Sequence, residues 1–162
     1  MAKLIIFKND YDTQSAIQNV FSYVGNGSKS CGYTGAQNML ISSGFEQVNA
    51  VNRYFCNNTK KKVIHFVIAF AQEDYIGTED AFNTGYEVCS LLPEYQIMFS
   101  VHQNTDNLHI HFAMNPTSLL DGHKFCFTNS NTFKFITGLR AIFKAYGIKI
   151  GFDFAGCYKC RV

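Results

Sequence analysis

Residues 95–114 read YQIMFSVHQNTDNLHIHFAM, two largely apolar runs separated by a polar segment. Successive side chains of a strand point to opposite faces, and both runs fit that alternation, so we expect strands over 95–102 and 108–114. The segment between them, QNTDN, is rich in residues that favour turns. The sequence therefore predicts an antiparallel hairpin.

This hairpin is expected to bring three imidazoles together. His109 and His111 are two residues apart, which is about 6–7 Å along one strand face, and the pairing carries His102 to the same place. Three nitrogen ligands on a rigid sheet, with positions left open for a substrate, are typical of a catalytic metal site. By itself, such a ligand set suggests zinc, copper or nickel. We expect His65, inside an apolar run, to be a satisfied core residue and His123, after a turn, to be exposed.

Further elements are predicted on both sides of the hairpin from apolar periodicity and from capping residues. They are a helix over 13–24 capped by Asp12 or Thr13, a buried strand over 63–70, a helix from Thr78 to just before Pro93, a loop and strand within 118–127, and a helix from Ser130 or Asn131 to Gly147. This order predicts an α+β fold, a central and mainly antiparallel sheet with helices packed on one side.

Length and composition favour one folded domain. The chain has 162 residues, of which 47% are hydrophobic and 15% aromatic, and this excludes disordered and fibrous classes. We expect a single domain over 1–162, with a core of about 13–150 and a tail over 151–162. The net charge of +2 does not by itself point to nucleic acid.

The sequence also bears on cellular location. The apolar run at residues 4–7 is too short for a signal peptide, and no run approaches the roughly 18–20 residues of a membrane helix. We therefore expect a soluble, cytoplasmic protein without a membrane partner, and cysteines that are thiols. Cys157 and Cys160 form a close pair, but a four-cysteine zinc site would need a second pair.

The segment 102–115, HQNTDNLHIHFAMN, resembles the three-histidine motif of conjugative relaxases, the plasmid mobilization nucleases of the HUH endonuclease class. That motif reads H-x-D-T-x-N-x-H-x-H followed by apolar residues and Asn. Residues 65–70, HFVIAF, are similar to the family's H-x-x-x-S-F strand, and the likeness covers most of 13–150. Two positions differ: Asn104 replaces an Asp that can orient a ligating imidazole, and Ala69 replaces a Ser that can contact DNA.

The resemblance implies a fold, an activity and partners. The fold is the HUH endonuclease palm. The activity is metal-dependent, site- and strand-specific nicking of single-stranded DNA at a plasmid or mobile-element transfer origin, by transesterification through a 5′-phosphotyrosine. The implied ion is Mg²⁺ or Mn²⁺, completed by water and phosphate oxygens, and accessory mobilization proteins are expected partners in conjugation.

A tyrosine must supply the nucleophile in such a reaction, and its phenol, with a pKa near 10, needs activation. Residues 21–24, FSYV, resemble the family's short nucleophile motif, which makes Tyr23 the first candidate. Tyr33 is a near alternative. Tyr146 is a further alternative, because Tyr146 to Lys149 resemble the Tyr-x-x-Lys motif of rolling-circle replication initiators. Glu73, or its neighbour Asp74, is the candidate to receive the phenolic proton or to shape the metal site.

Basic residues supply candidate DNA contacts, with Phe and Tyr rings available to stack unpaired bases. They are Lys60, Lys61, Lys62, Lys124, Lys134, Arg140 and Lys144. Three other functions stay open from the sequence: a DNA-binding relaxase-like protein that has lost catalysis with the acid at 104, a rolling-circle initiator using Tyr146, and an unrelated three-histidine metalloenzyme acting on small molecules.

Overall fold

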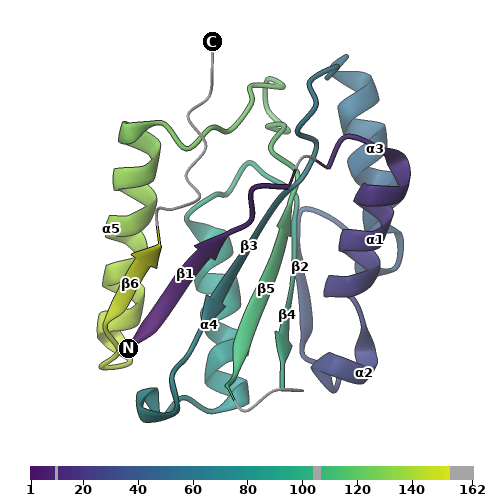
Figure 1. The fold of residues 1–162 in the computed structure, drawn as a ribbon. Coiled ribbons are helices and arrows are strands. Elements are labelled where there is room, and N and C mark those ends of the chain that lie inside the picture. The colour runs from purple at the N-terminus through teal and green to yellow at the C-terminus, as the bar shows by residue number, and fades with distance from the viewer. Residues whose placement is uncertain (10, 104–106, 154–162) are drawn as a thin grey trace.

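The computed structural model describes residues 1–9, 11–103 and 107–153 and contains one six-stranded sheet (Figure 1). The strand order is β2-β4-β5-β3-β1-β6, and every neighbouring pair is antiparallel except β1 and β6. The strands are β1 (Ala2–Ile6), β2 (Thr34–Gln37), β3 (Ile64–Ala69), β4 (Ile97–His102), β5 (His109–Met114) and β6 (Ile150–Asp153).

Five α-helices and two short 3-10 turns connect these strands within the described residues. The helices are α1 (Gln14–Val24), α2 (Gly27–Ser30), α3 (Gly44–Tyr54), α4 (Thr78–Ser90) and α5 (Asn129–Ala145), and the turns are η1 (Ile41–Ser43) and η2 (Gln72–Asp74). Helices α4 and α5 lie along one side of the sheet (Figure 1). The predicted α+β class, with a mainly antiparallel sheet and helices on one side, is confirmed.

Strand alternation divides the core between the two faces of the sheet. Phe99 and Phe112 point toward α4 and α5 and belong to the larger cluster of buried residues. Met98 and Ala113 point the other way and pack against α1, near the edge where α1 and α3 stand (Figure 1). Strand β4 is therefore buried on both faces, which is why its polar Ser100 and His102 are also buried.

The two predicted strands of the hairpin pair with each other and the first helix is present, whereas residues 104–106 of the expected turn, Asn104 among them, lie outside the described residues. In the pairing of β4 with β5, His102 lies opposite His109 and Ser100 lies opposite His111. At the start of α1, the Thr13 hydroxyl accepts a hydrogen bond of 3.2 Å from the backbone N–H of Ala16, so Thr13 is the cap. The pairing places the three histidines on the face that carries α1.

Several predicted details are wrong. Thr78 does not cap α4, whose N-cap is Gly77; the Thr78 hydroxyl instead accepts a bond of 3.0 Å from the Gln103 side chain. Segment 118–127 forms no strand, and within the described residues its only ladder contact is an isolated bridge from Thr117 to Lys124. The sheet also contains β1 and β6, which are not among the elements expected from the sequence.

Cysteines and membrane segments can be compared with expectation only in the described part of the chain, which excludes Cys157 and Cys160. Cys31, Cys56 and Cys89 are free thiols as expected, whereas Cys126 is disulfide-bonded. No helix in residues 1–9, 11–103 and 107–153 combines the length and the apolar character needed to cross a bilayer.

The packing of α4 on the sheet depends on a glycine. A Cβ on Gly85 would overlap the ring of Phe99, which is fully buried. Gly85→Ala is therefore expected to lower the free energy of unfolding by about 1–3 kcal/mol, the usual cost of overpacking a core, as measured by urea denaturation. Gly27→Ala is the control, because a Cβ there meets nothing within 4 Å. Equal losses in the two variants would contradict this packing.

Candidate metal centre and active site

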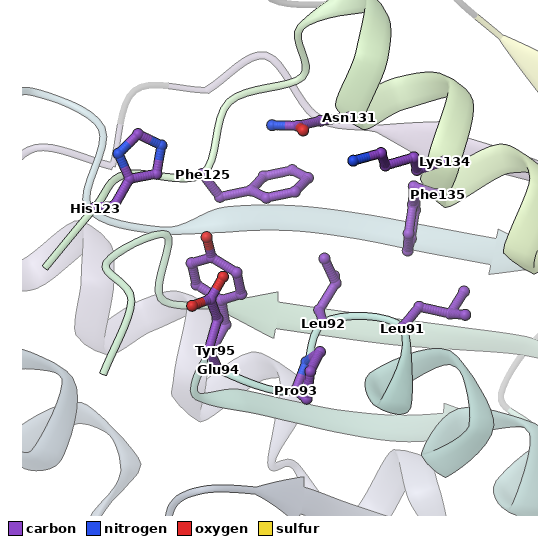
Figure 2. Close-up of a pocket in the computed structure, with 10 residues that line it drawn as sticks. All are labelled: Leu91, Leu92, Pro93, Glu94, Tyr95, His123, Phe125, Asn131, Lys134 and Phe135. Atoms are coloured by element: carbon purple, nitrogen blue, oxygen red, sulfur yellow. The ribbon is translucent and has the colours of Figure 1, made fainter. Parts of the chain in front are cut away.

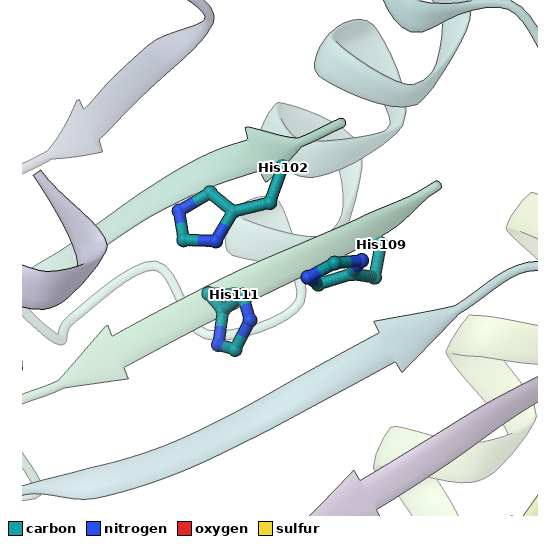
Figure 3. A group of neighbouring side chains, drawn as sticks. All are labelled: His102, His109 and His111. Atoms are coloured by element: carbon teal, nitrogen blue, oxygen red, sulfur yellow. The ribbon is translucent and has the colours of Figure 1, made fainter. Parts of the chain in front are cut away.

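The hairpin brings His102, His109 and His111 together, as the sequence predicted. His102 projects from β4 and the other two from β5, with their rings turned toward one another (Figure 3). One nitrogen from each ring can be chosen so that all three lie within 4.8 Å of one another. Metal–imidazole bonds are about 2.1 Å long, so small side-chain rotations allow one ion to contact all three.

A hydrogen bond fixes the tautomer of His102. The Ser100 hydroxyl donates its one proton to the carbonyl oxygen of Val24. In its contact with His102, 2.8 Å away, the Ser100 oxygen must therefore accept, and Nε2 of His102 carries the donated proton. The lone pair of His102 then lies on Nδ1, which is buried and has no hydrogen-bond partner within the described part of the chain. A buried nitrogen in this condition is costly, and a cation between the three histidines would satisfy it.

His109 is oriented by the backbone. Its Nδ1 lies 2.9 Å from the carbonyl oxygen of Asn107. A carbonyl only accepts, so Nδ1 carries the proton and the lone pair lies on Nε2.

A chain of three side chains ends at His111. The Tyr11 hydroxyl is 3.1 Å from Nδ1 of His65, and Nε2 of His65 is 3.0 Å from Nδ1 of His111. Phe7 stacks on the His65 ring with 4.4 Å between centroids and so fixes its plane. We assign the proton of His111 to Nδ1, which leaves the lone pair on Nε2. Such outer partners set ligand orientation and basicity in metal sites.

Burial keeps the imidazoles of His65, His102 and His111 neutral. Burial, with a smaller contribution from His102, lowers the pKa of His65 to about 4, and burial with neighbouring His109 lowers that of His102 to about 4. Burial and the adjacent imidazoles lower the pKa of His111 to about 2. Neutral imidazole is the form that binds metal. The donor set therefore fits a divalent cation.

Tyr23 lies directly beside this cluster. Its ring centroid is 5.5 Å from that of His102 and 5.1 Å from that of His111, both in edge-on geometry. The side chain is 39% exposed, so an external molecule can reach it. The Lys29 ammonium lies over the Tyr23 ring, 4.0 Å from its centroid, and makes a cation–π contact with it.

The two alternative tyrosines lie on the other side of the sheet. Tyr33 packs against Phe82 in the core beneath α4. Tyr146 belongs to the same packed region, and its hydroxyl donates to the Glu87 carboxylate at 3.1 Å. The histidines project from the opposite face, so the structure joins neither tyrosine to them.

The two candidate acids lie at the amino terminus. The amino group of Met1 is 3.2 Å from a Glu73 oxygen and 2.9 Å from an Asp74 oxygen. A backbone N–H and, to a smaller extent, the amino terminus lower the pKa of Glu73. No contact described for Glu73 reaches the three histidines or Tyr23.

The candidate DNA contacts fall into separate groups. Lys124 donates to the carbonyl of Lys61, and burial, with the nearby Lys62, lowers its pKa to about 8. Lys60 is exposed in the same segment, whereas the Arg140 guanidinium of α5 lies over the Phe152 ring of β6.

Lys134 and Lys144 lie on the α5 side as well. Lys134 lines a cavity of about 330 Å³ between α5 and the turn after α4, together with His123 and Phe125 (Figure 2). Lys144 lines a different cavity together with Arg140. Only the group of Lys60, Lys61, Lys62 and Lys124 adjoins the histidine side, because the N–H of Lys62 donates to the carbonyl of Tyr11.

Sequence reasoning missed three residues of the site: Tyr11, His65 and Lys29. His65 is buried and satisfied as predicted, but one of its two hydrogen-bond partners is His111 of the three-histidine cluster, and the other is Tyr11. One signal was available for it. In a strand over 63–70, alternation puts His65 on one face with Val67, and Val67 lies opposite His111 in the pairing of β3 with β5. Tyr11 and Lys29 come from loop and short-helix segments without such periodicity.

Comparison with known proteins agrees with this geometry. No curated protein matches the chain. A model of the MobA/VirD2-like relaxase nuclease domain matches residues 23–148, which is most of the chain and includes Tyr23 and all three histidines. The resemblance carried by the histidine motif is thereby confirmed. The chain belongs to the family of MobA/VirD2-like relaxases, and its residues 23–148 match the nuclease domain of that family.

Proposed function

We propose that this chain is a metal-dependent, site- and strand-specific nickase of single-stranded DNA that acts at a plasmid or mobile-element transfer origin in the cytoplasm. The observation that carries the proposal is the position of Tyr23. Its partly exposed ring lies against His102 and His111, which supports the proposal that Tyr23 is the nucleophile beside a metal held by these histidines.

In the proposed reaction the Tyr23 hydroxyl oxygen attacks the scissile phosphate. A bond forms from this oxygen to phosphorus, and the bond from phosphorus to the 3′ oxygen breaks. The 3′ oxygen leaves as a hydroxyl after taking up a proton, and the other strand end stays attached as a 5′-phosphotyrosine. We do not assign the phenolic proton to Glu73, because its described contacts are with the amino terminus.

The histidines have the role of ligands. We propose Nδ1 of His102 and Nε2 of His109 and His111 as donors to Mg²⁺ or Mn²⁺, with phosphate oxygens completing the coordination. When bound, this ion offsets negative charge on the phosphate oxygens. Ser100, Asn107 and His65 hydrogen-bond the other ring nitrogen of His102, His109 and His111 respectively, which leaves the proposed donor nitrogens available for the ion.

Lys29 is proposed to contact the DNA backbone at the reacting group. Its ammonium already lies on the Tyr23 ring, where it can contact the scissile phosphate and stabilise a phenolate. Lys60, Lys62 and Lys124 extend the basic surface past Tyr11, whereas the Lys61 amine is buried. Because the net charge is only +2, nonspecific affinity for DNA is expected to be weak. Accessory mobilization proteins are therefore proposed partners.

The direct test is covalent capture. The protein is incubated with Mn²⁺ and 5′-labelled or 3′-labelled single-stranded transfer-origin DNA, then separated under denaturing conditions. We expect a protein–DNA adduct with the 3′-labelled strand only, because the 5′ phosphate of the downstream fragment is retained. DNA binding without an adduct would instead support the alternative of a relaxase-like protein that has lost catalysis.

His65 provides a test of the ligand geometry. His65→Phe keeps a ring against Phe7 but removes the acceptor for Nδ1–H of His111. Loss of such an outer partner lowers metal affinity by about 10–100-fold, which titration of Mn²⁺ followed by its paramagnetic resonance would measure. The matched control is His123→Phe, at an exposed position. Unchanged affinity in His65→Phe would show that His111 is oriented by other groups.

A further inference from the structure

A cavity opens beside the proposed reaction site and is used by neither the metal nor the nucleophile. It has a volume of about 540 Å³, within the range of small-molecule sites. It lies between α1 and the segment that follows β1, and we call it the α1 cavity. Tyr23 and His111 belong both to its wall and to the histidine site. A molecule bound at the metal can therefore reach into it.

The walls of the α1 cavity are largely aromatic and apolar. Phe7, Tyr11 and Tyr23 contribute rings, and Ala16 and Val20 of α1 contribute apolar surface. Two of these rings are held in place: Phe7 is stacked on His65, and the Tyr11 hydroxyl is bonded to the same imidazole. Fixed rings of this kind suit a flat aromatic ligand, because little ordering remains to be done on binding.

The polar groups of the cavity are neutral. Asn9 and Asn19 line it with side-chain amides, each of which offers both a donor and an acceptor. None of its described lining residues carries a carboxylate or a cationic amine, so the lining does not suit a phosphate. The nearby cation, Lys29, instead stands on the Tyr23 ring. The positive charge of Lys29 therefore lies at the Tyr23 ring but outside the cavity lining, which is aromatic, apolar and neutral.

We propose that the α1 cavity binds an unpaired nucleobase, that of a nucleotide adjoining the phosphate that Tyr23 attacks. The inference rests on the proposed function and adds to it a base-reading subsite. The base stacks between the rings, and the amides of Asn9 and Asn19 meet its polar edge. Amide side chains recognise base edges by paired donor and acceptor contacts, so the subsite makes the enzyme selective for the base at one position beside the nick.

The subsite can be tested without any nicking. The full chain is titrated with each of the four deoxynucleoside 5′-monophosphates, and with deoxyribose 5-phosphate as a base-free control, while ligand binding is followed by saturation-transfer NMR. We expect at least one nucleotide to bind fivefold or more tightly than the base-free phosphate. Equal binding of all five compounds would overturn the proposal.

Variants place the binding in the cavity. Asn19→Ala removes an exposed amide, and Ala16→Phe fills the space; both are expected to weaken nucleotide binding fivefold or more. Gln18→Ala, on the same helix but outside the cavity, is expected to change nothing. Circular dichroism checks the fold of Ala16→Phe, and Asn19→Ala keeps the test valid if that variant unfolds. Nucleotide binding that is unaffected in Asn19→Ala and in a folded Ala16→Phe would overturn the assignment.

A second measurement separates this inference from the proposed function. Strands captured covalently from a random single-stranded pool are sequenced, and the base preference beside the nick is compared between wild type and Asn19→Ala. Loss of preference at one position supports the subsite, and an unchanged preference contradicts it. If no strand is captured at all, the proposed function fails, while base-dependent binding of the monophosphates still decides the subsite.

Discussion

Tyr23→Phe is expected to abolish covalent attachment of single-stranded DNA to this protein. The substitution keeps the ring that lies 5.5 Å from His102 and 5.1 Å from His111, and it keeps the platform for Lys29. It removes only the hydroxyl oxygen, without which no phosphotyrosine can form. Adduct formation should fall by at least about 10³-fold, whereas thermal stability should change little because the side chain is partly exposed.

The controls for this result are the two tyrosines on the other side of the sheet. Tyr33→Phe and Tyr146→Phe are expected to form adduct at the rate of the wild type, measured on denaturing gels with Mn²⁺ present. The reverse pattern, with the adduct kept in Tyr23→Phe and lost in Tyr146→Phe, would identify a rolling-circle initiator. Metal and DNA affinity should be unchanged in Tyr23→Phe, and this distinguishes loss of the nucleophile from loss of the site.

The parts of the fold with strong local signals could be predicted. Alternation over 95–114 and its polar turn were enough to specify β4, β5 and the face that carries the histidines. Strand β2, with the sequence TGAQ, has no such signal. It forms because β4 supplies its partner and because Gly35 leaves room for the Phe99 ring, and both causes are long-range.

The segment 118–127 shows the opposite error. A loop and a strand are expected within this segment, yet its Phe125 and Phe127 are buried side chains of irregular structure that packs into the core. Aromatic rings can be buried without strand pairing when an irregular segment with a turn directs them into the core. Periodicity over so few residues therefore could not distinguish a strand from a packed loop.

The candidate site likewise contains residues that local sequence spacing predicts and residues that it does not. The three histidines follow from one hairpin, so local spacing predicts their meeting. The partners that fix His111 come from the register of β3 against β5 and from Tyr11 in the segment after β1. Lys29 reaches Tyr23 only because α2 folds back beside the end of α1. These contacts depend on tertiary packing that no short stretch of sequence specifies.

His109→Ala is expected to weaken metal binding strongly and, with it, nicking. His109 is half-buried at the start of β5 and is oriented by a backbone carbonyl, so its truncation leaves the core intact. His102 and His111 would then be the two remaining proposed ligands of the three. Since loss of an outer partner alone costs about 10–100-fold in affinity, loss of a ligand should weaken Mn²⁺ binding by at least about 100-fold, as measured by calorimetric titration.

The same experiment can separate a ligand from a structural residue. Chelation of the wild type by EDTA should reproduce the loss of adduct, and excess Mn²⁺ should partly restore it in His109→Ala, because weakened binding is overcome by mass action. His123→Ala, at an exposed position on the other side of the molecule, should bind Mn²⁺ and form adduct as the wild type does. Wild-type Mn²⁺ affinity in His109→Ala would exclude this residue as a ligand, and adduct formation by the wild type in EDTA would exclude a metal from the reaction.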